Sequence, residues 1–433
     1  MSAAHGNKMK KYFYKCFDCG KTYDKDTIEK NLIYLCPNCG KVEKNQPLRG
    51  VLLIEYDYSS IKKKHSKKDF LKLQPGKFWQ YDFLWPINFK NPAVASLIRN
   101  DINRLALPQN SLFKYSYEGK DFFVLDETRN PTLSFKDRAS SLVAIKAIEL
   151  GINFISAAST GNAGSSLAGI CARLGLKSTI FVSRNIPEAK RMQIQAFGAG
   201  LIIVDGDYDF AFDTCLEISS ANKWYNRNTA YNPLTIEGKK SAAYDIFILT
   251  KGNLPDIIFI PTGDGAILSG IFKGLCELKQ LGWIKQLPKL ISVQSTGGNA
   301  FARYMKSKKF EYQPALSVAD SICAGAPRAL YYGYEAITKT NGEVIEVSDE
   351  EILEAQKYSA KNFGIIIEPS SSSSLAAYKK YIEQGKLKNQ KVLLLFTGNG
   401  LKDISALSKW NQSIPPLTLE QIKIKYLSEQ KNN

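Results

Sequence analysis

Short apolar runs alternate with amphipathic segments over two long regions of the chain. Between residues 150 and 204 this pattern predicts strands at 154–158, 179–182 and 201–204, with a helix between each pair. A second region of the same kind runs over residues 256–396. Repeated strand–helix–strand units place their strands in parallel, so we predict an α/β protein whose sheets carry helices on both faces.

Three of the predicted strands lead into glycine-rich turns. In chain order these turns are Ser159-Thr160-Gly161-Asn162-Ala163-Gly164, Pro261-Thr262-Gly263-Asp264-Gly265-Ala266 and Thr397-Gly398-Asn399-Gly400. A strand, a glycine turn and a helix together direct backbone N–H groups and a helix N-terminus at an anion. A single turn of this kind is weak evidence, because tight strand–helix connections look the same. Their repetition indicates an anionic ligand.

A lysine lies shortly before the first of these two regions, near the predicted start of a helix. Ser134 is a suitable N-cap, and Phe135, Ala139 and Leu142 recur at helical spacing. Lys136 therefore falls in the first turn, where positive potential and partial burial lower an amine's pKa and favour the neutral nucleophile. The alternative is an ordinary amphipathic helix with Lys136 on its surface.

Two Cys-x-x-Cys-Gly knuckles lie near the N-terminus. Their cysteines are Cys16, Cys19, Cys36 and Cys39. Four thiolates at this spacing are typical of a closed, structural zinc site. The alternatives are two disulfides or a ribbon that binds no metal.

Taken together, these segments resemble the threonine synthase family of pyridoxal-phosphate (PLP) enzymes, which has the β-elimination and replacement fold type of the tryptophan synthase β subunit. The resemblance rests on the order Pro-x-x-Ser-Phe-Lys-Asp-Arg, Ser-Thr-Gly-Asn, Pro-x-Gly and Thr-Gly-x-Gly-Leu-Lys-Asp. It implies an α/β fold with two parallel-sheet, three-layer domains preceded by a small zinc ribbon. The expected division is a ribbon at 1–45, a large PLP domain at 46–140 plus 231–412, a small domain at 141–230 and a peripheral tail at 413–433.

The resemblance also implies roles for individual residues. Lys136 would hold PLP and later move protons, Asn162 would bind the cofactor's phenolic oxygen, and Thr397 would meet its pyridine nitrogen. The cofactor's phosphate would lie on Gly263, Asp264, Gly265, Ala266 and Ile267. The substrate's α-carboxylate would bind backbone N–H groups of Ser159, Thr160 and Gly161, and its phosphate has three candidate ligands, Lys190, Lys240 and Arg328.

The implied reaction converts O-phospho-L-homoserine and water to L-threonine and phosphate. The chain departs from family patterns at Asp264, Ala266 and Ile267, and also at Thr235, Cys323 and Ala326, all near the expected ligands. Another PLP-dependent β-eliminating or β-replacing enzyme, such as a serine/threonine dehydratase or an amino-acid synthase, is therefore the alternative. A nucleic-acid-binding zinc-ribbon protein with an inactive PLP fold is a third reading, which intact Lys136, Asn162 and Thr397 disfavour.

The composition of the chain bears on its partners, its location in the cell and its possible general base. The formal net charge of +17 suits an anionic ligand, but lysine is spread along the chain, so we expect no nucleic-acid partner. We see no signal peptide and no apolar run long enough to span a membrane, and single cysteines in apolar contexts fit a reducing cytoplasm. With two histidines in hydrophilic N-terminal surroundings, a histidine general base is not expected. We expect a homodimer.

Overall fold

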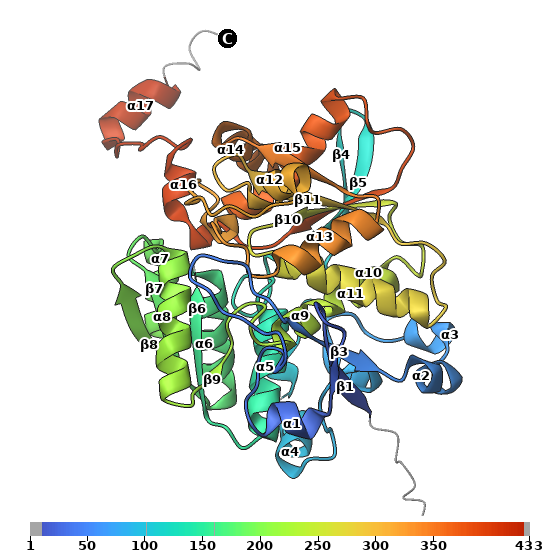
Figure 1. The fold of residues 1–433 in the computed structure, drawn as a ribbon. Coiled ribbons are helices and arrows are strands. Elements are labelled where there is room, and N and C mark those ends of the chain that lie inside the picture. The colour runs from blue at the N-terminus through green and yellow to red at the C-terminus, as the bar shows by residue number, and fades with distance from the viewer. Residues whose placement is uncertain (1–10, 101, 160, 428–433) are drawn as a thin grey trace, which may run out of the picture.

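The strands of the protein form three sheets, each built from a different part of the chain (Figure 1). The computed structural model describes residues 11–427 except residues 101 and 160. Within that part of the chain there is a small antiparallel sheet, a six-stranded mixed sheet and a four-stranded parallel sheet. The predicted α/β architecture with two parallel-sheet units is confirmed.

The small N-terminal sheet has the strand order β2-β1-β3. Its elements are β1 (Tyr12–Cys16), β2 (Thr22–Tyr23), α1 (Lys25–Glu29) and β3 (Leu52–Tyr56). Alternate side chains of β1 are buried because successive residues of a strand point to opposite faces. Strand β3 pairs with β1 along its whole length, so the sheet continues beyond residue 45, where we had expected the ribbon to end.

Short helices connect this sheet to the body of the protein. They are α2 (Tyr58–Lys64), α3 (Lys67–Phe70), the 3₁₀ helix η1 (Phe78–Leu84), α4 (Pro92–Asn100) and the 3₁₀ helix η2 (Ile102–Leu105). Phe78 and Tyr81 are buried, and the ring of Tyr81 contacts those of Phe70 and Tyr244. The aromatic residues of η1 therefore pack into the core.

The six-stranded sheet has the order β12-β11-β10-β13-β5-β4. Its strands are β4 (Leu112–Tyr117), β5 (Lys120–Asp126), β10 (Ile257–Pro261), β11 (Lys289–Ser295), β12 (Glu343–Val347) and β13 (Val392–Phe396). All neighbours are parallel except β4 and β5, which form a hairpin at one edge. The carboxyl ends of β5, β10 and β13 consequently meet at one edge of the sheet.

Helices cover both faces of this sheet, as its apolar strands require. One face carries the 15-residue α11 (Ala266–Gln280) with α10 (Ser241–Leu249) and α13 (Leu330–Lys339), and the other carries α14 (Asp349–Tyr358) and α15 (Pro369–Glu383). Strand β13 divides between the two cores: Leu393 and Leu395 pack under α11, whereas Leu394 and Phe396 pack under α15. The half of the protein that holds the six-stranded sheet also contains α12 (Ala300–Ser307), η3 (Asp320–Ile322) and η4 (Ser359–Phe363).

The four-stranded parallel sheet has the order β8-β7-β6-β9. Its strands are β6 (Phe154–Ser159), β7 (Lys177–Ser183), β8 (Gly200–Val204) and β9 (Tyr225–Asn226). Helices α6 (Asn162–Leu174) and α8 (Tyr208–Ala221) pack on it, and α7 (Glu188–Ala196) packs on α6. This unit lies beside the six-stranded sheet, at the lower left of Figure 1.

Two helices lie between the two large sheets. Helix α5 (Asp137–Glu149) packs against α6 on one side and against α9 (Leu234–Lys239) on the other.

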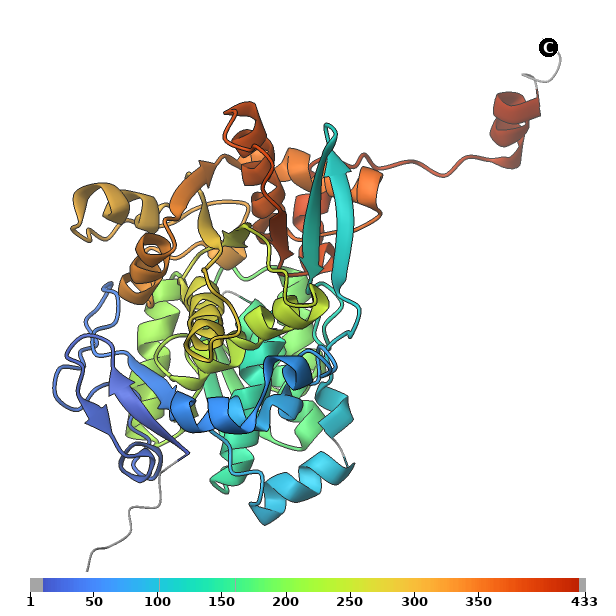
Figure 2. The same ribbon diagram turned by 90° about the vertical axis from the view of Figure 1, so that its right-hand side faces the viewer.

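After η5 (Gly400–Lys402) and α16 (Ile404–Ser408), the last helix of the described residues is α17 (Leu419–Leu427), which stands away from the body in both views (Figure 2). No helix of the described residues is long and apolar enough to cross a bilayer.

A buried ion cluster connects α5 to its surroundings and yields a stability prediction. The Arg138 guanidinium lies 2.6 Å from Glu127 Oε1 and 2.7 Å from Asp245 Oδ2, and all three side chains are almost fully buried. Arg138→Met leaves two carboxylates without their cation, so we expect the free energy of unfolding to fall by about 3–5 kcal/mol. Urea denaturation followed by circular dichroism measures the change.

The matched control is Lys114→Met. Lys114 pairs with Asp121 at 2.6 Å, but both side chains are more than half exposed, so its loss costs about 0–1 kcal/mol. Equal effects of the two substitutions would contradict the structural role of Arg138.

Candidate active site

Lys136 lies immediately before α5, between the two large sheets. The predicted capping by Ser134 is wrong: Lys136 itself occupies the N-cap position, and the buried Ser134 hydroxyl has no partner. Ser134 instead forms a β-bridge with Gly398, and the Phe135 N–H donates to Thr397 O at 2.8 Å. The turn after β13 thus determines where this loop runs and competes successfully with a helix cap.

The two residues after Lys136 hold it from both sides. The Asp137 carboxylate accepts hydrogen bonds from the Thr132 N–H at 2.7 Å and the Ser166 hydroxyl at 2.7 Å, which ties the loop to α6. Arg138 ties it to β5 and α10 through Glu127 and Asp245. Lys136 is therefore presented from a rigid segment, as a reacting group requires.

The Lys136 side chain is partly exposed toward the pocket, and its ammonium makes no hydrogen bond or ion pair with any residue that the structure describes. Burial lowers the pKa of Lys136; Glu368 acts in the opposite direction, and the charges of Arg227 and Lys190 lower the pKa further. A desolvated lysine next to other cations is more easily deprotonated and is then a nucleophile.

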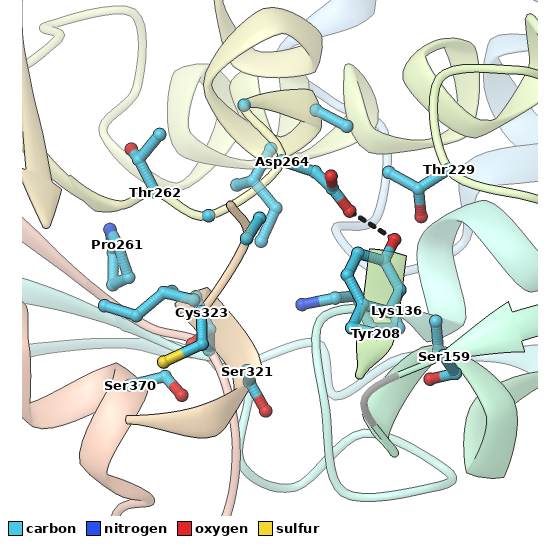
Figure 3. A pocket seen from close by; sticks show the side chains of 18 of the residues that line it. Lys136, Ser159, Tyr208, Thr229, Pro261, Thr262, Asp264, Ser321, Cys323 and Ser370 are labelled. Carbon is cyan, nitrogen blue, oxygen red and sulfur yellow. Dashed lines mark hydrogen bonds between the residues drawn. The ribbon is translucent and has the colours of Figure 1, made fainter. Parts of the chain in front are cut away.

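A pocket surrounds Lys136 at the carboxyl ends of β6, β10 and β13, where open parallel sheets bind ligands. Its lining comes from both large sheets and includes Ser159, Tyr208, Thr229, Lys239, Thr262, Ser321, Cys323, Ser370 and Thr397, together with residues 263–267. Figure 3 shows the Lys136 amine directed into this space, with Tyr208 beside it bonded to Asp264 and with Cys323 and Ser370 on the opposite side. The structure thus brings Lys136, Ser159 and Thr397 together with the predicted phosphate loop.

The loop between β10 and α11 is suited to a phosphate. Among the described residues, the backbone N–H groups of Gly263, Asp264 and Gly265 have no hydrogen-bond acceptor, and they precede a long helix. Gly265 has φ +81°, and a Cβ on Gly263 would lie 2.8 Å from Ile322 Cα, so neither position accommodates a larger residue without strain. The Asp264 carboxylate accepts from the Tyr208 hydroxyl at 2.6 Å and from the Arg328 N–H at 3.1 Å.

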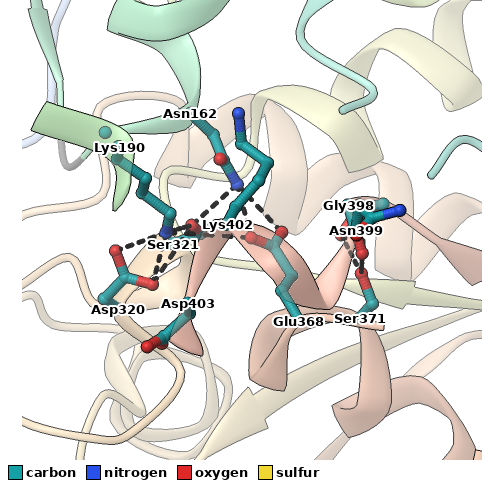
Figure 4. A network of polar contacts seen from close by, with 12 residues as sticks. Asn162, Lys190, Asp320, Ser321, Glu368, Ser371, Gly398, Asn399, Lys402 and Asp403 are labelled. Carbon is teal, nitrogen blue, oxygen red and sulfur yellow. Dashed lines mark hydrogen bonds and ion pairs between the residues drawn. The ribbon is translucent and has the colours of Figure 1, made fainter. Parts of the chain in front are cut away.

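Asn162 begins α6 and belongs to a polar network (Figure 4). Its Nδ2 donates to Glu368 Oε2 at 2.7 Å and to Ser321 Oγ at 2.9 Å, while its Oδ1 is buried without a partner. Lys190 Nζ joins the same network, 2.7 Å from Asp320 Oδ2 and 3.7 Å from Glu368 Oε2. Lys190 is therefore near the site, but its charge is already compensated.

The predicted carboxylate turn is partly occupied by its own side chain. The Ser159 hydroxyl accepts hydrogen bonds from the N–H groups of Gly161 and Gly164, both at 2.8 Å. The Gly161 N–H is thus already engaged in the structure, which corrects the expectation that it is available to a carboxylate. Thr160 lies outside the described residues.

The predictions for Lys240 and Arg328 do not agree with the structure, because buried carboxylates away from the pocket hold both charges. Lys240 Nζ lies 3.0 Å from Glu277 Oε2 and also contacts Glu237. Arg328 pairs with Asp209 at 3.1 Å and donates to Gln46 O at 3.0 Å. Neither side chain lines the pocket.

Several site residues escaped the sequence analysis. Tyr208, Asp320 and Ser321 lie outside any glycine turn, and nothing in the local sequence marks them. Lys239 and Glu368 had a signal, because the segments 232–240 and 368–377 are also similar to the family pattern, but neither residue was given a role. The contact of Glu368 with Asn162 spans 206 residues of chain.

A second cluster lies in the N-terminal sheet. The sulfur atoms of Cys16, Cys19, Cys36 and Cys39 all lie within 4.8 Å of one another. Four thiolates around one zinc ion at Zn–S distances of about 2.3 Å would be roughly 3.8 Å apart, so the spacing fits a tetrahedral metal site. The N–H groups of Cys19 and Asn38 approach the sulfurs of Cys16 and Cys36, both at 3.4 Å, as metal-bound thiolates require.

Comparison with known proteins places the chain in a family. A family model described as "Pyridoxal-phosphate dependent enzyme" matches residues 108–398. The threonine synthase of Methanocaldococcus jannaschii is 33% identical over 411 residues, which cover 94% of this chain and 96% of that protein. The chain belongs to the threonine synthase family. The resemblance seen in the sequence is thereby confirmed.

Other members of the threonine synthase family extend this result. The threonine synthase of Methanosarcina acetivorans is 32% identical and covers 90% of this chain and 92% of its own length. Among solved structures, a fungal L-serine ammonia-lyase from Rhizomucor miehei has a TM-score of 0.60 at 19% identity, covering 69% of this chain and 96% of that one. The processed form of threonine deaminase isoform 2 from Solanum lycopersicum has a TM-score of 0.56 at 18% identity, with coverages of 86% and 96%. These structural similarities show the fold.

The close packing of Gly263 generates a prediction about cofactor retention. In Gly263→Ala the new Cβ meets backbone atoms of Ile322, so the loop must move and its N–H groups lose their alignment. We expect the dissociation constant for PLP to rise at least about tenfold, which corresponds to the loss of roughly one charge-assisted hydrogen bond. Dialysis followed by the absorbance of the retained cofactor measures this.

Gly385→Ala is the control, because Gly385 has a positive φ but no atom within 4 Å of the added Cβ. It carries backbone strain without touching the pocket. Unchanged PLP retention in Gly263→Ala would contradict the assignment of this loop to the phosphate.

Proposed function

We propose that this protein is a threonine synthase, converting O-phospho-L-homoserine and water to L-threonine and phosphate. The observation that carries the proposal is the identity of about one third with threonine synthases along nearly the whole chain. The site supports it, since the pocket combines a lysine of lowered pKa with a loop suited to a phosphate.

The residues around the pocket fit PLP. Lys136 has no partner among the described residues, and the buried oxygens Asn162 Oδ1 and Ser370 Oγ are likewise unpaired. The N–H groups of Gly263, Asp264 and Gly265 would hold the cofactor's phosphate, and the buried Thr397 hydroxyl, 3.1 Å from Ser371 Oγ, would face its pyridine nitrogen. When bound, PLP supplies an electron sink for carbanions at the substrate's α and β carbons.

Among the residues around the pocket, Lys136 is the group that can transfer protons. Of the two histidines, His65 stacks on Phe83 at 3.7 Å, away from the pocket lining, and His5 lies outside the described residues. Lys136 is therefore the basic group placed to take protons from the substrate's α and β carbons and to return protons at the γ and α carbons, while phosphate leaves the γ carbon and water adds at the β carbon. Desolvation lowers the pKa of Lys136 and so favours its neutral, proton-accepting form.

Product analysis tests the proposal. The purified protein with bound PLP, given O-phospho-L-homoserine, should release L-threonine and inorganic phosphate in equal amounts. Borohydride reduction should attach the cofactor to Lys136, and Lys136→Ala should lose both the label and at least about 1,000-fold in kcat, because no other base replaces it.

Two outcomes would contradict this function. Deamination of serine or threonine to a 2-oxo acid, without turnover of phosphohomoserine, would make the protein a dehydratase. A label on a lysine other than Lys136 would move the site.

We also propose that the cysteine cluster holds one zinc ion with a structural role. All four ligands come from the protein, and none faces the pocket, so the site has no open position for chemistry. The N-terminal sheet in turn contacts the body through Lys146, whose Nζ lies 3.3 Å from Glu29. Metal binding would thus stabilise the sheet that covers this part of α5.

Metal analysis should find about one zinc per chain. Cys16→Ser should remove the zinc and lower the thermal midpoint, since metal binding contributes directly to folding. The activity of the protein that stays folded should be retained, with Cys276→Ser, a cysteine outside the cluster, as the control. Loss of activity with fold and PLP content intact would contradict a purely structural role.

The remaining expectations form part of the same proposal. The division into a ribbon at 1–45, a large domain at 46–140 plus 231–412, a small domain at 141–230 and a tail at 413–433 is supported by the separate sheets, with the first boundary shifted by β3. A cytoplasmic location is supported by cysteines that are all unbridged. A homodimer stays a prediction that sedimentation can test.

A further inference from the structure

Buried basic residues around the pocket fall into two groups, according to whether a carboxylate compensates them. Lys190 pairs with Asp320 and Arg328 pairs with Asp209. A buried cation costs several kcal/mol unless an anion or several acceptors surround it, so these pairs are what a stable interior requires.

Lys239 and Arg227 belong to the other group. Lys239 is the last residue of α9, is 1% exposed and lines the pocket, and its ammonium donates one hydrogen bond, to Thr235 O at 3.0 Å. No carboxylate oxygen of the described residues lies within 4.0 Å of it. Besides Lys136, no other basic side chain lines the pocket in the part of the chain that the structure describes.

Arg227 lies behind the pocket, directly after β9, and is fully buried. Its guanidinium contacts neutral hydroxyls, Thr229 Oγ1 at 3.2 Å and Ser140 Oγ at 3.4 Å, and its Nη2 has no hydrogen-bond partner. A guanidinium carries five N–H donors, so an unpaired buried Nη2 is an unused binding group.

The two charges repel each other in the absence of an anion. Burial, followed by the charges of Arg227 and Lys136, holds the pKa of Lys239 well below its usual value, and burial lowers the pKa of Arg227 to about 10. Asp264, whose charge favours both cations, is already bonded to the Tyr208 hydroxyl and the Arg328 N–H. Among the described residues, the pocket lining thus includes two lysines, Lys136 and Lys239, and one carboxylate that is already engaged.

We infer that Lys239, supported electrostatically by Arg227, binds the phosphate of the substrate. The inference deepens the proposed function and rests on it for the identity of the substrate. The phosphate of PLP has its own neutral cradle in the N–H groups that begin α11, whereas Lys239 offers an ammonium with two unused N–H donors at the pocket wall. Lys239 and Arg227 therefore take the role that the sequence analysis gave to Lys240 and Arg328.

The test compares Lys239→Gln and Lys239→Arg with the parent, all as PLP-loaded proteins. Lys239→Gln should raise both the KM for O-phospho-L-homoserine and the dissociation constant of inorganic phosphate, measured by calorimetry, at least about 30-fold, as expected for a lost charge-assisted contact. Lys239→Arg keeps the charge, so its KM and its dissociation constant for phosphate should stay within about fivefold of the parent values. Lys279→Gln, on the exposed end of α11, is the control.

A second measurement distinguishes the phosphate of the substrate from the phosphate of PLP. The affinities of PLP and of pyridoxal, which lacks the phosphate, are compared in parent and Lys239→Gln. A loss confined to PLP, with the binding of inorganic phosphate to the loaded protein unchanged, would assign Lys239 to the cofactor and overturn the inference. Unchanged phosphate binding and unchanged KM would overturn it as well.

Two further provisions keep the test decisive. If Lys239→Gln does not fold, Lys239→Met retains an unbranched apolar chain of similar length and removes the charge. If the parent makes threonine and Lys239→Gln has the same KM and the same affinity for inorganic phosphate, the inference about Lys239 is refuted while the proposed function stands. A parent that makes no threonine, yet binds inorganic phosphate in a manner dependent on Lys239, would refute the proposed substrate while the anion subsite stands.

Discussion

The buried ion cluster of Arg138, Glu127 and Asp245 determines where Lys136 lies. Arg138 is two residues from Lys136, and its partners come from the end of β5 and from α10. On the other side of the lysine's loop, Phe135 is bonded to the turn after β13. A lysine side chain is long and flexible, so a reacting amine is well positioned only when its backbone is fixed on both sides, as it is here.

The same requirement, that a buried charge must be compensated, organises the rest of the site. Lys190 lies on α7 of the four-stranded unit and finds Asp320 on η3, in the other half of the protein. Arg328 finds Asp209 on α8, across the same junction in the opposite direction. These pairs hold the two units together around the pocket. Because both cations are already paired with carboxylates, neither is available to bind a ligand.

Local features of the fold were predictable from the sequence, and contacts across the junction were not. The strands that end at Ser159, Pro261 and Phe396 are visible as apolar runs before glycine turns, and open parallel sheets bind ligands at the carboxyl ends of such strands. The family resemblance added that Lys136, Asn162, the phosphate loop and Thr397 act at one site, although β6 belongs to a different sheet from β10 and β13.

Errors arose where a long-range partner overrode a local preference. Ser134 is a good cap by type, but a bridge to Gly398, far along the chain, draws the loop into a different path. Lys240 and Arg328 are basic residues in family-like segments, and their fate depends on Glu277 and Asp209, which no local pattern connects to them. Charge alone could not separate them from Lys239, which lines the pocket and has no carboxylate partner among the described residues.

Asn162 shows how the network restricts the chemistry available to a ligand. Glu368 is buried and, as a carboxylate, only accepts hydrogen bonds, so it directs the Asn162 amide nitrogen toward itself and leaves Oδ1 as the unpaired atom. Lys190 Nζ lies 3.7 Å from Glu368 Oε2, so this ion pair helps to fix the carboxylate that orients Asn162. A salt bridge at the junction of the two units thereby decides whether Asn162 offers a donor or an acceptor at the pocket.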